Sequence, residues 1–232
     1  MFILGIETST KTGSVAVVSE NGVIAEYTLN IEVTHSERLM STVDRVLKDT
    51  GLTMSDMDGF GVAIGPGSFT GLRIGLSTVK GLAFVTGKPV AAVPTLRALA
   101  WNLPYPAYPV CPMLDARKKE VYAALYRYDG ASIAQEMPEA TISISRLAER
   151  ITEKTVFTGE AAHIYRGEIE KIFEERALFA PLSASVPSGA SVAELALDMI
   201  KSSRHMDPDN LTPLYIRRPE AEVAWEKRQK SP

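Results

Sequence analysis

The chain has 232 residues with 45% hydrophobic and 23% charged content, which suits one large or two small globular domains with a buried core. Its formal net charge of -3 argues against a broad cationic surface that grips nucleic acid without a partner. Cys111 is the only cysteine, so no intrachain disulfide is possible, and the three histidines stand too far apart for a zinc motif. The apolar start carries no basic residue before Glu7, which indicates a strand and not a signal peptide, so we expect a cytoplasmic protein.

The first hundred residues alternate between strand and helix patterns. Three strands are predicted at 3–7, 14–19 and 23–30, joined by tight turns. Thr34 and Glu37 have capping-box spacing and start a helix that Gly51 ends. A strand at 59–64, a helix at 69–86, a strand at 89–93 and a helix at 96–101 follow. The predicted order is therefore βββαβαβα.

The glycine-rich helix at 69–86 follows a Gly-Pro-Gly-Ser turn and is the most unusual element. Its apolar and small residues cover an arc of about 200°, roughly twice what a helix on one core needs. Each internal glycine costs about 1 kcal/mol relative to alanine, so Gly71 and Gly75 must permit a close approach. Phosphate-loop spacing is absent. The neighbour is either the protein's own core or a partner helix, and we expect a partner.

The second half reads as a reduced copy of the same order. Strands are predicted at 110–115, 121–128 and 133–144, with short strands at 155–158 and 178–180. Helices are predicted at 146–151, at 162–173 and after Ser188. A proline-rich hinge near 104–112 separates the halves. We therefore expect one unit at 1–103, a second at 104–218 and a polar tail at 219–232.

Two βββαβαβα halves joined by a hinge form the duplicated α/β architecture of the actin, Hsp70 and sugar kinase (ASKHA) superfamily. Four motifs carry a closer resemblance across residues 1–218: ILGIETST, THSERL, GPGSFTGLRIGLSTVKGLA and PLYIR. Together they resemble the bacterial TsaB family, also called YeaZ. The resemblance implies a non-catalytic scaffold that works with TsaD and the ATPase TsaE. That assembly transfers threonylcarbamoyl from its adenylate to the adenosine beside the tRNA anticodon.

In this family the first two helices meet TsaD, and the same surface pairs two copies when TsaD is absent. The resemblance therefore implies a partner surface made of His35, Leu39, Met40, Val43, Gly71, Leu72, Gly75, Thr78, Val79 and Leu82. We expect tRNA to be reached only through the complex, with no membrane association. We expect no cofactor on this chain, because ATP is used by the partner subunits.

An ATP-dependent transferase, or a peptidase, is the alternative function. The turn with Glu7, Thr8, Ser9 and Thr10 resembles half of a phosphate site, either vestigial or a weak nucleotide contact. The matching turn runs from Asp115 to Lys119 without glycine, and the adenosine motif is reduced to Thr158-Gly159-Glu160. Leu39 stands four residues after His35, where the catalytic relatives have their second histidine ligand. Ser68 lacks a nucleophile elbow, so we expect no catalytic residue and no metal ligand.

Overall fold

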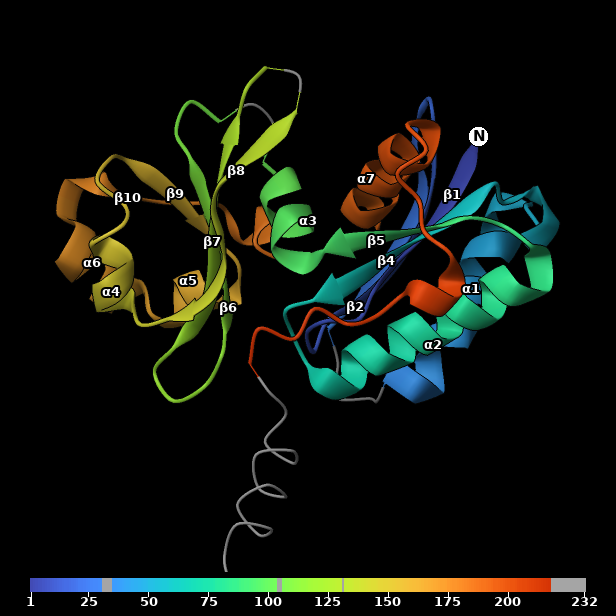
Figure 1. The fold of residues 1–232 in the computed structure, drawn as a ribbon, viewed down its shortest axis with the longest axis horizontal. Coiled ribbons are helices and arrows are strands. Elements are labelled where there is room, and N and C mark those ends of the chain that lie inside the picture. Colours follow the sequence, from blue (N-terminus) through green and yellow to red (C-terminus); the bar gives the residue numbers. More distant parts are fainter. Residues whose placement is uncertain (31–34, 104–105, 131, 218–232) are drawn as a thin grey trace, which may run out of the picture.

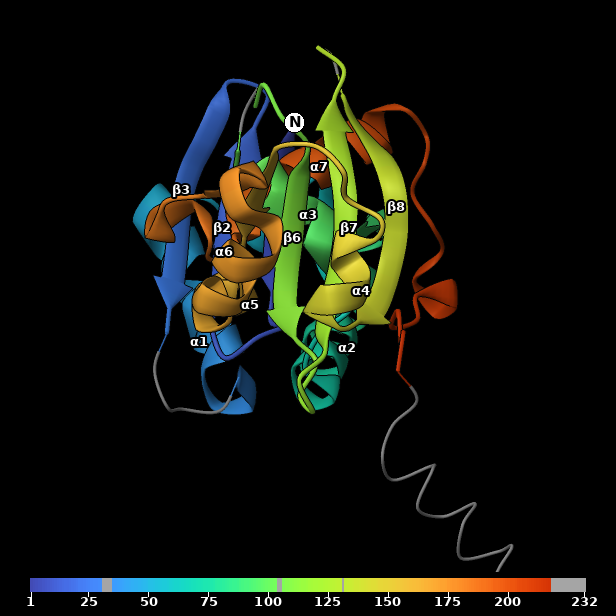
Figure 2. The same cartoon turned by 90° about the vertical axis from the view of Figure 1, so that its left-hand side faces the viewer.

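The computed structural model describes residues 1–30, 35–103, 106–130 and 132–217 as two mixed five-stranded sheets side by side, each with helices on both faces (Figure 1). The strand orders are β3-β2-β1-β4-β5 and β10-β9-β6-β7-β8, which are the same topology repeated. Viewed from the side of the second sheet, the strands of that sheet stand in front of the first (Figure 2). The predicted duplication is confirmed. The predicted tail at 219–232 lies outside the described residues.

The first eight elements follow the predicted order, and their boundaries agree within two residues. They are β1 (Phe2–Glu7), β2 (Gly13–Ser19), β3 (Gly22–Leu29), α1 (His35–Thr50), β4 (Gly59–Gly65), α2 (Phe69–Thr86), β5 (Val90–Pro94) and α3 (Thr95–Trp101). The bounds of α2 are those predicted. The capping residue predicted for α1, Thr34, lies outside the described residues.

The second series departs from prediction mainly in its short helices. Its elements are β6 (Val110–Asp115), β7 (Val121–Tyr128), β8 (Ile133–Ile142), α4 (Ile144–Ala148), β9 (Thr155–Thr158), α5 (Glu160–Ile164), α6 (Arg166–Phe173), β10 (Ala177–Phe179) and α7 (Gly189–Lys201). The helix predicted at 162–173 is two helices that meet at Tyr165. Helix α4 begins earlier than predicted because the hydroxyl of Ser143 accepts a bond from the Arg146 backbone N–H.

The last helix of each half covers the sheet of the other half. Helices α1 and α2 pack on one face of the first sheet, and α7 packs on its opposite face. Helix α3 lies on the second sheet, where Leu96 and Leu99 contact Val110 and Leu114. The predicted division at residue 103 is therefore wrong for α7, which belongs to the first core. An apolar stripe shows that a helix is buried but does not identify the sheet that buries it.

Two glycines on the first sheet allow α7 to approach closely. A Cβ at Gly5 would lie 2.2 Å from the carbonyl oxygen of Gly189, and one at Gly61 would lie 2.6 Å from Cβ of Ala196. The sheet can therefore carry no side chain at these two points under α7, because packed interiors leave no spare volume.

We expect Gly61→Ala to lower the free energy of unfolding by about 1–3 kcal/mol, because the added methyl overpacks this contact. Urea denaturation measures the change. The control is Gly167→Ala, at a position where a Cβ would meet no atom within 4 Å. Equal stability of the two variants would show that α7 can shift away from the sheet without cost.

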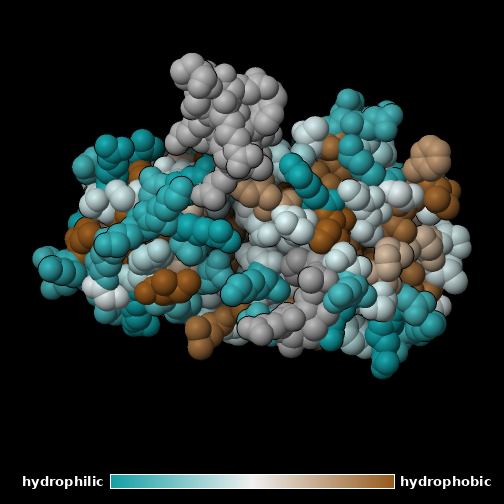
Figure 3. All heavy atoms as spheres, turned by 90° about the horizontal axis from the view of Figure 1, so that it is seen from below, coloured by the Kyte–Doolittle hydropathy of each residue, from teal (hydrophilic) through white to brown (hydrophobic). Residues whose placement is uncertain are grey.

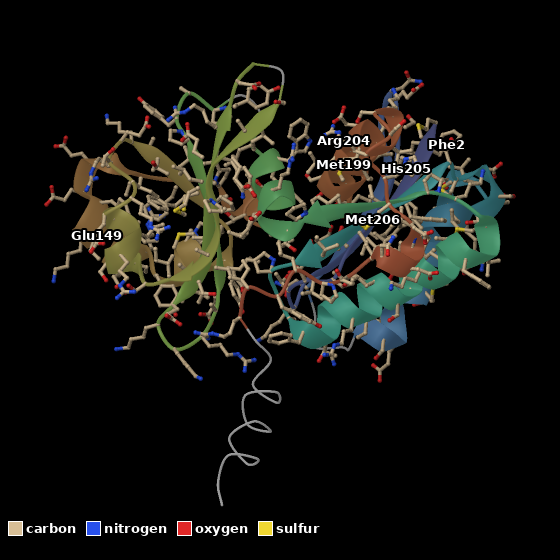
Figure 4. All side chains as sticks on the ribbon, in the orientation of Figure 1. Phe2, Glu149, Met199, Arg204, His205 and Met206 are labelled. Carbon is tan, nitrogen blue, oxygen red and sulfur yellow. The ribbon has the colours of Figure 1, made fainter. Side chains whose placement is uncertain are left out.

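After α7 the chain forms a C-terminal strap, residues 204–217, that connects the two halves. Met206 donates its backbone N–H to the Val90 carbonyl, and Leu214 donates to the Ile64 carbonyl at 2.7 Å. Figure 4 labels Met199 and Arg204 at the end of α7, and Met206 where the strap passes β5. Residues 208–210 form a 3-10 turn within the strap. Leu211 is the most buried residue of the strap, at 1% exposure, whereas Leu214 is half-buried.

Candidate functional site

Helix α2 is capped at both ends by its own sequence and fixed on the sheet by one apolar stripe. Its N-terminal hydroxyl, on Ser68, accepts a bond from the Gly71 backbone N–H, and Gly87 ends it with φ of 68°. Leu72, Leu76, Val79 and Ala83 are buried against the first sheet. The hydroxyl of Ser68 therefore acts as a helix cap.

The glycine face of α2 packs against this protein and not against a partner. A Cβ at Gly75 would lie 2.4 Å from Oγ1 of Thr8, and that hydroxyl donates to the Gly71 carbonyl at 2.8 Å. The expectation that a partner helix approaches Gly71 and Gly75 is wrong. The turn after β1 fills that space, and sequence spacing cannot show that it does.

Several other residues predicted to bind a partner are also buried. Leu39, Val43, Leu72 and Val79 pack in the first core and hold α1 and α2 on the sheet. Their side chains are unavailable to another protein, which corrects the prediction for these four. The remaining predicted residues are Met40, which is 51% exposed, Thr78 and Leu82, which are half-buried, and His35, whose side chain lies outside the described part.

The outer face of α2 carries exposed apolar residues that the sequence reading missed. Phe84 and Val85 are 88% and 83% exposed, and a Cβ at Gly81 would meet no atom within 4 Å. The underside of the molecule shows hydrophobic surface at the outer end of this half, among hydrophilic side chains (Figure 3). A helical wheel could have identified this exposed face from the sequence, because Gly81 lies opposite the buried Leu72 and Val79. We call Gly81, Phe84 and Val85 the exposed helical face.

The turn with the predicted vestigial phosphate residues is closed inside the protein. Glu7, Thr8 and Ser9 are buried, and Thr10 is partly exposed. Oε1 of Glu7 accepts the Ser9 backbone N–H at 2.5 Å, while Oε2 of Glu7 and the Ser9 hydroxyl have no hydrogen-bond partner among the described residues. Burial raises the pKa of Glu7 to about 7. This carboxyl group is therefore held largely by packing.

The hairpin after β6 carries bulky side chains where a phosphate turn needs glycine. Arg117, Lys118 and Lys119 all have positive φ, between 55° and 63°, a conformation that favours glycine. The strap fastens this hairpin, because Arg217 donates to the Ala116 carbonyl at 2.6 Å and pairs with Glu120. The strap, which is bonded to the first half at Leu214, is thereby tied to the second half as well.

The position of the adenosine motif is acidic. Burial raises the pKa of Glu160 above its usual value, and the charge of Asp115 adds to this, while a hydrogen bond to the Asp115 backbone and the charge of Lys11 oppose the change. Two carboxylates beside this turn would repel nucleotide phosphates. In the described parts of the chain, no group of three His, Cys, Asp or Glu side chains has the arrangement of a metal site.

The structure does contain one serine–histidine contact, between Ser185 and His163. The Ser185 Oγ lies 2.9 Å from Nε2 of His163, but the same hydroxyl donates to the Pro181 carbonyl at 3.1 Å. Its proton is therefore engaged elsewhere, and the serine is only 5% exposed. An activated nucleophile needs a hydroxyl that gives its proton to the base, so this pair does not support peptidase chemistry.

Comparison with known proteins identifies the family. Residues 22–225 match the family model described as TsaD: tRNA N6-adenosine threonylcarbamoyltransferase. The chain is 33% identical to the tRNA threonylcarbamoyladenosine biosynthesis protein TsaB of Bacillus subtilis, over 99% of this chain and 100% of the relative. The chain belongs to the TsaB family. Escherichia coli TsaB is 30% identical over 98% of each chain.

Solved structures agree with this TsaB-family assignment. YeaZ from Pseudomonas aeruginosa superposes with a TM-score of 0.80 at 28% identity, covering 92% of this chain and 99% of that one. The ROK hexokinase of Thermus thermophilus has a TM-score of 0.52 at 12% identity, over 87% of this chain and all of the hexokinase. The second likeness concerns the fold alone, and it confirms the predicted sugar-kinase-like architecture. In the described parts of the chain, no helix is both long and apolar enough to cross a membrane.

Proposed function

We propose that this protein is a non-catalytic scaffold subunit of the assembly that forms threonylcarbamoyladenosine in tRNA. The observation that carries the proposal is the exposed helical face, where Phe84 and Val85 lie almost fully in solvent. Large exposed apolar side chains that gather on one surface are typical of a protein-binding site. Family membership supplies the pathway, because the full-length relatives are named as biosynthesis proteins for this modified nucleoside.

The partner that best fits this face is a TsaD-type transferase. A stretch of 79 residues is 44% identical to the tRNA N6-adenosine threonylcarbamoyltransferase of Methylobacterium nodulans, over 34% of this chain and 22% of that protein. Two chains of related fold carry related helices, so a pseudo-symmetric pairing through α1 and α2 is geometrically natural. The same face would pair two copies of this chain when the transferase is absent.

The altered turns after β1, β6 and β9 support a scaffold role in preference to catalysis. Glu7 is buried and Glu160 stands where adenosine would bind, while Arg117, Lys118 and Lys119 replace a small phosphate turn. We therefore assign ATP use to the partner subunits, including a TsaE-type ATPase, and tRNA contact to the complex. The net charge of -3 agrees with that division, since tRNA binding relies on cationic surface. We place this assembly in the cytoplasm.

We expect the isolated protein to hydrolyse no ATP and to transfer no threonylcarbamoyl group, and we expect modification of tRNA when the transferase, the ATPase and the adenylate are added. The reason is that the turn after Glu7 is buried and the turn at 117–119 carries long side chains where a phosphate turn needs glycine. Quantification of the modified nucleoside in tRNA tests this. Turnover by this chain alone that disappeared in Glu7→Ala would contradict the scaffold function.

A further inference from the structure

A cavity of about 570 Å³ lies between the two halves of the molecule, and its lining includes neither the exposed helical face nor the turns after β1, β6 and β9. Its lining includes Glu26 of β3, Trp101 at the end of α3, Tyr128 at the end of β7 and Glu194 of α7. Figure 1 shows how α3 lies between the second sheet and α7. Cavities of this size at the junction of two packed units are common sites for small ligands.

The first carboxylate of the cavity, Glu26, is held by neutral groups. Its Oε1 accepts bonds from the hydroxyls of Ser14 at 2.8 Å and Ser188 at 2.7 Å, and from the Ala190 backbone N–H at 3.2 Å. The N-terminus of α7 therefore orients this oxygen. Oε2 takes part in none of these bonds and keeps its capacity to accept.

The second carboxylate, Glu194, is oriented in the same way by a single neutral donor. Its Oε2 accepts the indole N–H of Trp101 at 2.7 Å. Within the described residues, neither Glu26 nor Glu194 forms an ion pair with a basic side chain, and the cavity lining includes no Lys, Arg or His. In the part of the chain that the structure describes, the cavity therefore contains two carboxylates without a cationic partner, of which Glu26 is exposed and Glu194 is half-buried.

Another polar side chain of the lining, Asn102, already has its hydrogen bonds within the protein. Asn102 donates to the carbonyls of Ala184 and Val186 and accepts the Ser191 hydroxyl at 2.6 Å. The rings of Trp101 and Tyr128 lie 6.5 Å apart between centroids, inclined at 39°. Free carboxylate oxygens and aromatic faces both attract a cation, so the unused binding capacity of this cavity is selective for positive charge.

We propose that this cavity binds an organic cation with a guanidinium or primary ammonium head group and a short apolar stem. The head group is placed by Glu26, Glu194 and the ring faces, and the stem lies along Val23 and Ile133, which also line the cavity. Such a head group belongs to small free metabolites and to the side chains of arginine and lysine. This binding site goes beyond the scaffold function and does not depend on it.

The experiment uses the indole N–H of Trp101 as a reporter. The chain has two tryptophans, so Trp225→Phe in the full-length protein leaves one indole signal in the NMR spectrum. We expect n-butylguanidinium to shift it saturably with a Kd of about 1 mM or below. The matched neutral probe, n-butylurea, should bind at least about tenfold more weakly, because it lacks the charge-assisted bonds.

Variants then test the two carboxylates. Glu26→Gln leaves the Trp101 bond untouched and should weaken n-butylguanidinium binding about tenfold, the loss of one charged partner. Glu194→Gln should weaken it similarly and keeps an oxygen for the indole. Asp198→Asn changes an exposed carboxylate one turn further along α7 that pairs with Arg204, and it should bind as the parent does. Thermal unfolding confirms that each variant is folded.

A second probe distinguishes the two sources of the head group. N-acetyl-arginine amide carries the same guanidinium on a peptide backbone, so equal binding of both probes assigns the cavity to a protein side chain, and binding of n-butylguanidinium alone assigns it to a free small molecule. Either result supports the proposal. Equal affinity for n-butylurea, no saturable shift with n-butylguanidinium, or unchanged affinity in folded Glu26→Gln would overturn it.

Discussion

Gly81→Trp should leave this protein folded and abolish its association with a TsaD-type transferase, whereas Gly75→Trp should prevent folding. The two glycines lie on the same helix, but a Cβ at Gly81 meets no atom within 4 Å and one at Gly75 lies 2.4 Å from Thr8. We expect association to weaken more than about 100-fold for Gly81→Trp, as for loss of an interface hot spot. We expect Gly75→Trp to cost more than about 3 kcal/mol of stability, because the core has no room for an indole.

Sedimentation with the transferase measures association, and urea denaturation of the isolated chain measures stability. Phe84→Asp is a second interface variant, since a side chain that is 88% exposed contributes little to folding. Leu182→Asp is its matched control, because Leu182 is exposed and apolar but lies in the second half, next to β10. Normal binding by Gly81→Trp and Phe84→Asp together would place the partner on another surface.

Stability should fall as the pH rises from about 4.5 to 7, because the buried Glu7 prefers its protonated form in the folded state. Its pKa is raised by burial from 4.5 to about 7. The folded protein therefore binds more protons than the unfolded chain in this window. The contribution of Glu7 is fully present below pH 4.5 and lost above pH 7, and it amounts to about 3 kcal/mol.

Glu7→Gln should remove this slope and make the protein more stable than the parent above pH 7, because an amide has no charge to bury. The amide oxygen can still accept the Ser9 backbone N–H. Denaturant unfolding at several pH values provides the measurement. Glu149→Gln is the control, since it removes an exposed carboxylate and should keep the slope. An unchanged slope in Glu7→Gln would assign the pH dependence to other groups.

Local patterns predicted most elements because each depends on neighbouring residues. Continuous apolar runs bounded by turn residues identified β1 and β2, and the Gly-Pro-Gly-Ser turn located the start of α2. The short elements were less regular. Helices α5 and α6 were predicted as one helix, because neither glycine nor proline occupies position 165, where the two helices meet.

Family membership was determined by the sequence alone, because the motifs of β1, α2 and the strap are contiguous strings that need no structure to be matched. The order of strands and helices along each half followed from the pattern of turns and apolar runs. The altered phosphate hairpin at 115–119 was also visible as side chains where glycine is required.

Only the tertiary structure decided which face of α2 is free and which sheet receives α7. Gly75 and Gly81 are both glycines of α2. The side chain of Thr8, 67 positions before Gly75 in the sequence, covers Gly75, whereas no described residue covers Gly81. Likewise, nothing in the sequence distinguishes Gly5 and Gly61 from other strand residues, and only the structure shows that α7 packs directly on them. These outcomes depend on contacts between segments distant in the chain, and the periodicity of one segment carries no information about its distant neighbour.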